Sequence, residues 1–291
     1  MKLSLSITTY TWPDGPAHLA RHLGDVAEAA DEAGIDTVWV PDHLLQGAPG
    51  RSPDDEMLEA YTTLGYLAAR TERVRLGAAV TGVTFRPAAL LVKAVTTLDV
   101  LSGGRAWLGV GAGYHGEEAR LMGLPLPAAA TRFAILEETL QLALRMWRGD
   151  ASPFVGTQLR LDGPISSPAP LHRPHPPILI GGTGEQKTLR YVARYGDACN
   201  VFDIPDGGAT IRLKLDVLAR HCAEAGRDYA EIDKTVSTRI EPGESAAEFV
   251  QRCGTLAELG LDHVMVITSG GWTDELLGVL AQARPQLDFA A

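Results

Sequence analysis

Cysteine is scarce in this sequence, and its scarcity excludes two kinds of protein. Three cysteines occur among 291 residues, at Cys199, Cys222 and Cys253. They are too few and too scattered to form a disulfide framework or a paired thiolate metal site, which is typical of proteins from a reducing compartment. We therefore expect three buried thiols in a cytoplasmic protein.

Basic charge and long apolar runs are also lacking. The chain has 26 basic residues against 36 acidic ones, a formal net charge of -10, which disfavours a phosphate backbone or an anionic membrane as partner. No apolar run is long enough to cross a bilayer. The first ten residues lack the charged, apolar and small-residue zones of a signal peptide. The sequence therefore predicts no nucleic-acid partner and no membrane partner.

What the sequence does contain is one repeated unit, a β-rich apolar run followed by a break and an apolar stripe at helical spacing. Eight strands, each followed by a helix, predict a closed (β/α)8 TIM barrel, and a doubly wound open sheet is the structural alternative. The expected strands are 2–8, 37–40, 74–81, 106–110, 178–180, 198–202, 235–239 and 263–267.

One segment interrupts this rhythm. Residues 149–177 contain a proline-rich run and a candidate hairpin at 154–161. We interpret the segment as an insertion between the fourth helix and the fifth strand, not as a linker. The prediction is therefore a single barrel domain spanning 1–291, with an excursion at about 149–177.

In a (β/α)8 barrel the functional residues follow the carboxyl ends of the strands. After the second strand stand Asp42 and His43, a carboxylate beside an imidazole. Histidine titrates near neutral pH and can donate or accept a proton in a transition state. His43 is therefore a candidate acid or base, and the alternative is a loop histidine bonded to a backbone carbonyl.

Glycines follow the third, fourth and fifth strands. Gly82 interrupts a β-branched run, which often marks a bulge or a close approach to a ligand. The segment 111–116 matches the dinucleotide fingerprint, but it follows the fourth strand and lacks the ribose-binding acid, which disfavours a nicotinamide site.

The run Gly181-Gly182-Thr183-Gly184 opens a helix expected over 185–195. It offers backbone amides, a hydroxyl and a positive helix end to an anion, so it is the best candidate for a phosphate-binding loop. A tight connection that needs glycine is the alternative. The segment 268–271, at the eighth strand, ranks second.

Other common catalytic signatures are missing. His172 and His175 lie in the proline-rich run without a cluster of acids or thiols, so no metal site is predicted. The sequence contains no zinc-protease helix, no Walker loop and no serine in a nucleophile elbow. Hydrolysis and phosphoryl transfer are therefore disfavoured.

Five segments in order form a specific pattern. They are 34–43, 75–84, 97–105, 176–183 and 196–200. Together they resemble the luciferase-like monooxygenase superfamily, and within it the oxidoreductases that use the deazaflavin coenzyme F420. The resemblance spans nearly the whole chain and implies a (β/α)8 barrel, which agrees with the periodicity.

The resemblance also implies where the cofactor binds. It implies a bulge with a non-prolyl cis peptide at the end of the third strand, here between Gly82 and Val83, behind the deazaflavin ring. The loop after the fifth strand would bind the cofactor phosphate. The implied cofactor-binding residues are Gly82, Val83, Gly111, Gly113, Gly181, Gly182 and Thr183.

By the same resemblance, His43 lies beside the redox centre and is the leading catalytic acid or base, with Asp42 orienting or tuning it. Family members that act on a sugar phosphate carry a glutamate where this chain has Tyr114, so that activity is not implied. Tyr114 is expected to cover the cofactor or to contact the substrate.

The expected reaction is hydride transfer between reduced F420 and a small organic substrate, in a protein that forms a homodimer. An FMN-dependent monooxygenase and a flavin-binding barrel without turnover are the alternatives.

Overall fold

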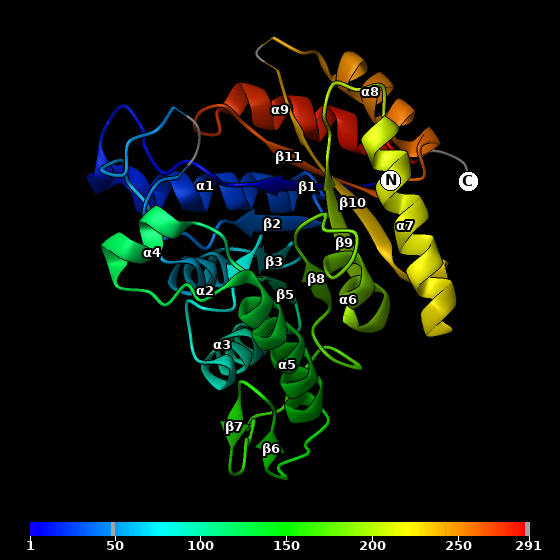
Figure 1. The fold of residues 1–291 in the computed structure, drawn as a ribbon. Coiled ribbons are helices and arrows are strands. Elements are labelled where there is room, and N and C mark those ends of the chain that lie inside the picture. The colour runs from blue at the N-terminus through cyan, green and yellow to red at the C-terminus, as the bar shows by residue number, and fades with distance from the viewer. Residues whose placement is uncertain (48–49, 242, 289–291) are drawn as a thin grey trace.

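The computed structural model describes residues 1–47, 50–241 and 243–288, and these form a parallel β-barrel surrounded by helices (Figure 1). Neighbouring strands pair in parallel, and the sheet closes because β1 pairs with β11 and β3 pairs with β5. The predicted (β/α)8 barrel is confirmed. The barrel strands are β1 (Lys2–Ser6), β2 (Thr37–Val40), β3 (Arg75–Ala78), β5 (Ala106–Gly111), β8 (Ile178–Ile180), β9 (Ala198–Phe202), β10 (Asp233–Arg239) and β11 (His263–Ile267).

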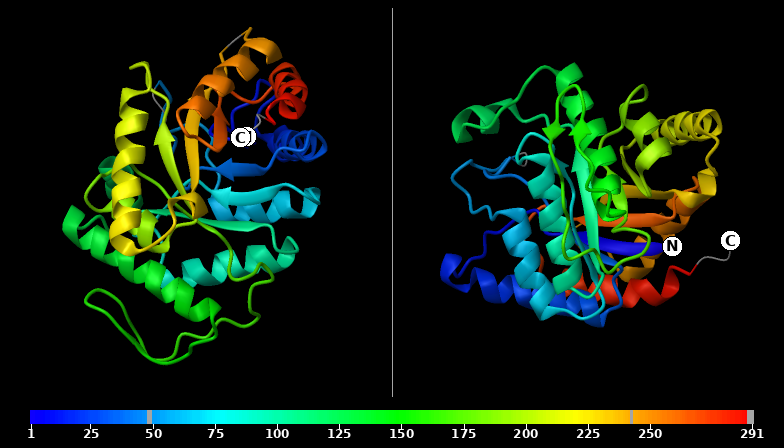
Figure 2. Two further views of the ribbon diagram at one scale, coloured as in Figure 1. Left: turned by 90° about the vertical axis from the view of Figure 1, so that its right-hand side faces the viewer. Right: turned by 90° about the horizontal axis from the view of Figure 1, so that it is seen from below.

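Helices alternate with these strands and lie on the outside of the barrel, as the two views of Figure 2 show. None of the helices within the described ranges combines the length and the apolar character that a membrane span needs. The helices are α1 (Leu19–Glu32), α2 (Ala60–Arg70), α3 (Ala88–Leu101), α4 (Gly116–Met122), α5 (Ala129–Trp147), α6 (Thr188–Tyr195), α7 (Ala209–Ala225), α8 (Ala246–Glu258) and α9 (Asp274–Ala283), with short 3-10 turns at Pro16–His18, Tyr229–Glu231 and Arg284–Gln286.

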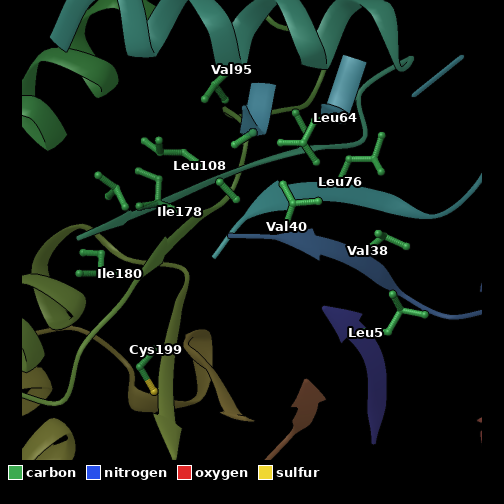
Figure 3. Close-up of a cluster of buried hydrophobic side chains, with 14 of the residues drawn as sticks. Leu5, Val38, Val40, Leu64, Leu76, Val95, Leu108, Ile178, Ile180 and Cys199 are labelled. Carbon is green, nitrogen blue, oxygen red and sulfur yellow. The ribbon is translucent and has the colours of Figure 1, made fainter. Parts of the chain in front are cut away.

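The core has two layers because successive strand residues point to opposite faces of the sheet. The first layer lies between strands and helices, where outward side chains such as Val38 and Leu108 join Leu64 of α2 and Val95 of α3 in one cluster (Figure 3). The second layer fills the inside of the barrel and consists of Trp39, Trp107, Leu179, Ala198 and Met265.

The absence of a side chain at Gly77 makes room for the two tryptophans of the inner layer. A Cβ at this position would lie 2.6 Å from the ring of Trp39 and 2.8 Å from Cβ of Trp107. The two indole rings meet at 5.5 Å between centroids. The side chains of Trp39 and Trp107 therefore fill the barrel below its mouth.

The third strand is broken near the mouth. β3 ends at Ala78, and β4 (Thr81–Gly82) resumes pairing with β5. A non-prolyl cis peptide lies in the break, but it joins Ala79 to Val80, so the expected cis bond between Gly82 and Val83 is wrong. The break comes earlier because Gly82 pairs with Gly111 in the β-ladder and the amide of Val83 donates to the Gly111 carbonyl at 3.0 Å.

Between α5 and β8 the chain forms an antiparallel pair, β6 (Phe154–Val155) and β7 (Arg160–Leu161), which lies below α5 in Figure 1. The carboxylate of Glu138 on α5 accepts the amides of Thr157 and Leu159 from the connecting turn, at 2.6 and 2.7 Å. The proline-rich segment that follows is bound to α3, where Asp99 accepts the amide of Leu171 at 2.6 Å. These carboxylates attach the segment to the outside of the barrel.

Candidate functional site

A small pocket opens at the carboxyl ends of β2, β4 and β5. It gathers residues that are far apart in the sequence, because parallel strands of a barrel end at the same face. Five residues predicted for the site meet here, and Val80, Phe85 and His115 complete the lining. The predicted five are Asp42, His43, Gly82, Gly113 and Tyr114.

The imidazole of His43 is held by a buried carboxylate that the sequence did not reveal. Nδ1 of His43 lies 2.8 Å from Oε2 of Glu118, whose side chain is 1% exposed. The other carboxylate oxygen, Oε1, accepts the backbone amides of Leu44 and Leu45 at 2.6 and 3.2 Å. His43 is therefore bound through one ring nitrogen, and its Nε2 faces the hydroxyl of Tyr114 at 3.4 Å.

Helix α4, which carries Glu118, was not predicted. The side chain of His115 caps its start, since Nδ1 accepts the amide of Glu118 at 3.1 Å. At the other end, Gly123 takes a left-handed conformation with φ of 66° and closes the helix. The acidic first turn and the glycine at its end were the available signals, but the glycines of 111–116 made the segment resemble a loop.

Asp42 has a different partner. Its Oδ2 and Oδ1 accept from Nη1 and Nη2 of Arg86 at 2.5 and 2.9 Å, and the Asp42 side chain is 0% exposed. Arg86 also bonds to Glu59 and lies over the ring of Tyr61, 4.8 Å from its centroid. Burial opposes the charge of Arg86, but these carboxylates raise the pKa of its guanidinium above the ordinary value. Asp42 is predicted to orient or tune His43, but the carboxylate that bonds to the His43 ring is that of Glu118.

Tyr114 stands over the open side of His43. The rings of His43, Tyr114 and His115 meet edge to face in a triangle, with centroids 5.8 to 5.9 Å apart. The tyrosine is 73% exposed, and its hydroxyl lies 3.4 Å from Nε2 of His43. Partial burial and then the charge of Glu118 raise the pKa of the phenol. Tyr114 therefore keeps its proton at neutral pH and is placed to donate to Nε2 of His43.

Val80 forms one wall of the pocket, and neighbouring glycines make room for it. A Cβ on Gly111 would lie 3.0 Å from the Val80 side chain, and a Cβ on Gly181 would lie 2.6 Å from it. The loop after β8 therefore packs against the break in the third strand. Gly111 and Gly181 thus lie behind Val80, next to the pocket, whereas the described lining does not include them or Gly182 and Thr183.

The loop that begins at Gly181 is longer than the sequence predicted. Helix α6 begins at Thr188, not at 185, so a turn separates the glycines from the helix end. Gly182 has φ of 106°, a conformation that side chains disfavour. Within the described part of the chain, the amides of Gly182, Thr183 and Gly184 donate no hydrogen bond. These free amides and the Thr183 hydroxyl suit an anionic group.

A second and larger pocket lies at the ends of β9, β10 and β11. Its volume is about 470 Å³, and Phe202, Ile204 and Ile267 supply its apolar lining. Arg239 and Arg252 supply positive charge there, and Asp203 and Glu241 supply negative charge. The barrel mouth therefore has a second space, separate from the pocket around His43, that could hold part of a ligand.

The chain matches the family model described as luciferase-like monooxygenase over residues 1–282. It is 31% identical over 245 residues to an F420-dependent glucose-6-phosphate dehydrogenase of Kineococcus radiotolerans, covering 82% of this chain and 69% of that protein. It is 32% identical over 227 residues to the protein of the same name from Amycolatopsis mediterranei, covering 76% and 65%. The match thus spans about two thirds of the length of these curated relatives.

The fold is also found among solved structures. An F420-dependent secondary alcohol dehydrogenase, solved in complex with an F420-acetone adduct, superposes with a TM-score of 0.82 at 17% identity. The superposition covers 99% of both chains. At this level of identity the likeness shows a shared fold.

Proposed function

The chain belongs to the luciferase-like monooxygenase family, and from this premise we propose that it is an oxidoreductase that uses coenzyme F420. The reaction is transfer of a hydride between the reduced deazaflavin and a small organic substrate. The observation that carries the proposal is His43, bound at Nδ1 and open at Nε2, in a pocket shared with Val80 and Gly82. The curated relatives named as F420-dependent support the choice of cofactor.

The residues at the mouth fit the proposed cofactor. Val80 and Gly82 would lie behind its ring, and Gly111, Gly113 and the neighbouring Val83 would shape the space around them. The free amides of Gly182 and Thr183 would bind its phosphate. F420 supplies the hydride carrier when bound, and the protein supplies binding and orientation.

The residues around His43 would handle the proton that accompanies the hydride. Nε2 of His43 is the ring nitrogen that faces the pocket, and the phenol of Tyr114 lies beside it. Tyr114 would cover the cofactor or contact the substrate, because most of its ring is exposed at the mouth. Asp42 would act indirectly, by holding the loop after β2 through Arg86.

Equilibrium binding to F420 and FMN, measured side by side on the purified protein, tests the cofactor. We expect a Kd for F420 that is micromolar or tighter, corresponding to about -8 kcal/mol, and much weaker binding of FMN. Ligand fluorescence provides the titration signal. Tight binding of FMN without binding of F420 would overturn the proposal in favour of an FMN-dependent monooxygenase.

Replacing Gly182 tests the phosphate loop. We expect Gly182→Val to raise the Kd for F420 by about tenfold or more, because valine disfavours a φ of 106° and would displace the free amides. Gly149→Val is the matched control, because Gly149 also has a positive φ, of 78°, and lies at the far end of α5. Equal affinity of Gly182→Val and wild type would move the phosphate site, most naturally to Gly270 and Gly271.

The proposal also covers the domain content, location and oligomeric state of the protein. We propose one barrel domain across 1–291, acting in the cytoplasm on a small molecule, without nucleic acid, as a homodimer. Light scattering after size-exclusion chromatography measures the mass of the particle. A mass of 31.0 kDa, that of one chain, would reject the homodimer.

A further inference from the structure

We propose that Glu118 is a positioning residue that selects the tautomer of His43. Its carboxylate keeps the proton of the neutral imidazole on Nδ1 and leaves the lone pair of Nε2 directed into the pocket. This inference rests on the proposed function, since it concerns the proton that His43 moves. It goes beyond that function because it assigns a role to a buried side chain on α4.

The first step is that Glu118, as a carboxylate, can only accept hydrogen bonds. Its Oε1 receives the amides of Leu44 and Leu45, which are obligatory donors. An ionised carboxylate has no proton to give to its third partner. At 2.8 Å from Oε2, Nδ1 of His43 must therefore supply the proton of that hydrogen bond.

The second step follows from the chemistry of imidazole. In a neutral ring one nitrogen is a donor and the other is an acceptor. With the proton on Nδ1, Nε2 can receive the proton that leaves the substrate as its hydride departs, and it returns that proton in the reverse direction. The carboxylate also stabilises the imidazolium that forms in between, as in other pairs of a carboxylate with a histidine.

His115 supplies an internal comparison. Its ring lies 5.8 Å from that of His43, but its Nδ1 accepts the backbone amide of Glu118 at 3.1 Å. The neutral His115 ring therefore carries its proton on Nε2. Glu118 thus holds two neighbouring histidines in opposite tautomers, one through its side chain and one through its backbone.

Glu118→Gln separates the two roles of the carboxylate. The carbonyl of glutamine can still accept the amides of Leu44 and Leu45, so the loop after β2 keeps its support. The amide nitrogen of glutamine can only donate, so it would force Nδ1 of His43 to accept and move the ring proton to Nε2. Glu117→Gln, at the exposed neighbouring position, removes the same charge without a contact to His43 and is the matched control.

The decisive readout is the tautomer itself, measured on the ligand-free protein by long-range proton–nitrogen NMR of the histidine rings. In wild type and in Glu117→Gln we expect a protonated Nδ1 on His43, and in Glu118→Gln we expect a protonated Nε2. His115 should show a protonated Nε2 in all three proteins. A wild-type His43 with its proton on Nε2 would overturn the inference even if the variant failed to fold.

Activity provides the second readout, with secondary alcohols screened as hydride donors and the change in deazaflavin absorbance as signal. We expect Glu118→Gln to lower kcat by about a hundredfold or more, while the Kd for F420 changes by less than about threefold. Unchanged kcat despite a reversed tautomer would reject the role of Glu118. By contrast, a wild-type protein that does not bind F420 would reject the proposed function. The tautomer measured on the ligand-free protein would still stand.

Discussion

Replacing His43 by alanine should lower turnover by about a hundredfold or more, the usual scale of general acid–base catalysis. The substitution removes Nε2, the ring nitrogen that faces the pocket, and leaves the loop at Gly182 untouched. The Kd for F420 should therefore change far less than kcat. Steady-state kinetics together with a fluorescence titration of the cofactor would measure both quantities on the same preparation.

His22→Ala is a suitable control, because His22 bonds to Asp14 and stacks on Trp12, outside the lining of the pocket. It should keep both kcat and cofactor affinity. If His43→Ala retained full turnover, the proton-transfer role would pass to Tyr114 or to an ordered water. If cofactor affinity collapsed instead, His43 would be chiefly a binding group, and the proposed mechanism would have no acid.

The barrel could be predicted from the sequence because its physical cause is local. Val38, Trp39 and Val40 alternate between the two core layers, and this alternation with a helical stripe after it is visible in the sequence itself. The same holds for the positions of Asp42 and His43, which follow from the end of β2. Sequence periodicity thus located the mouth of the barrel and the positions of Asp42 and His43 at it.

The contacts within the site could not be predicted in the same way, because they join distant parts of the chain. Glu118 meets His43 across 75 positions, and Arg86 meets Asp42 across 44. The family resemblance implied that Asp42 orients or tunes its neighbour His43, but the two side chains bond to different elements. The position of the cis peptide was also predicted wrongly. Gly82 indicated a cis bond at its own position, but the side chain of Val80, which follows the cis bond, fits because Gly111 and Gly181 lack a Cβ.

The largest expected effect on stability comes from Arg86→Met. The Asp42 carboxylate is fully buried, and the substitution would leave it without the two hydrogen bonds from the guanidinium. Breaking a buried ion pair by removing one partner costs about 3–5 kcal/mol, because an uncompensated charge remains in the interior. Urea denaturation monitored by tryptophan fluorescence would measure this loss in the free energy of unfolding.

Lys214→Met is the matched control, since Lys214 pairs with Glu185, whose side chain is 45% exposed, and such pairs contribute about 1 kcal/mol or less. Adding Asp42→Asn to Arg86→Met should restore part of the lost stability, because a neutral amide is less costly to bury than an unpaired carboxylate. A cost below about 1 kcal/mol for Arg86→Met would mean that water reaches Asp42. The attachment of the loop that carries His43 would then depend on Glu118 of α4 more than on the ion pair of Arg86 with Asp42.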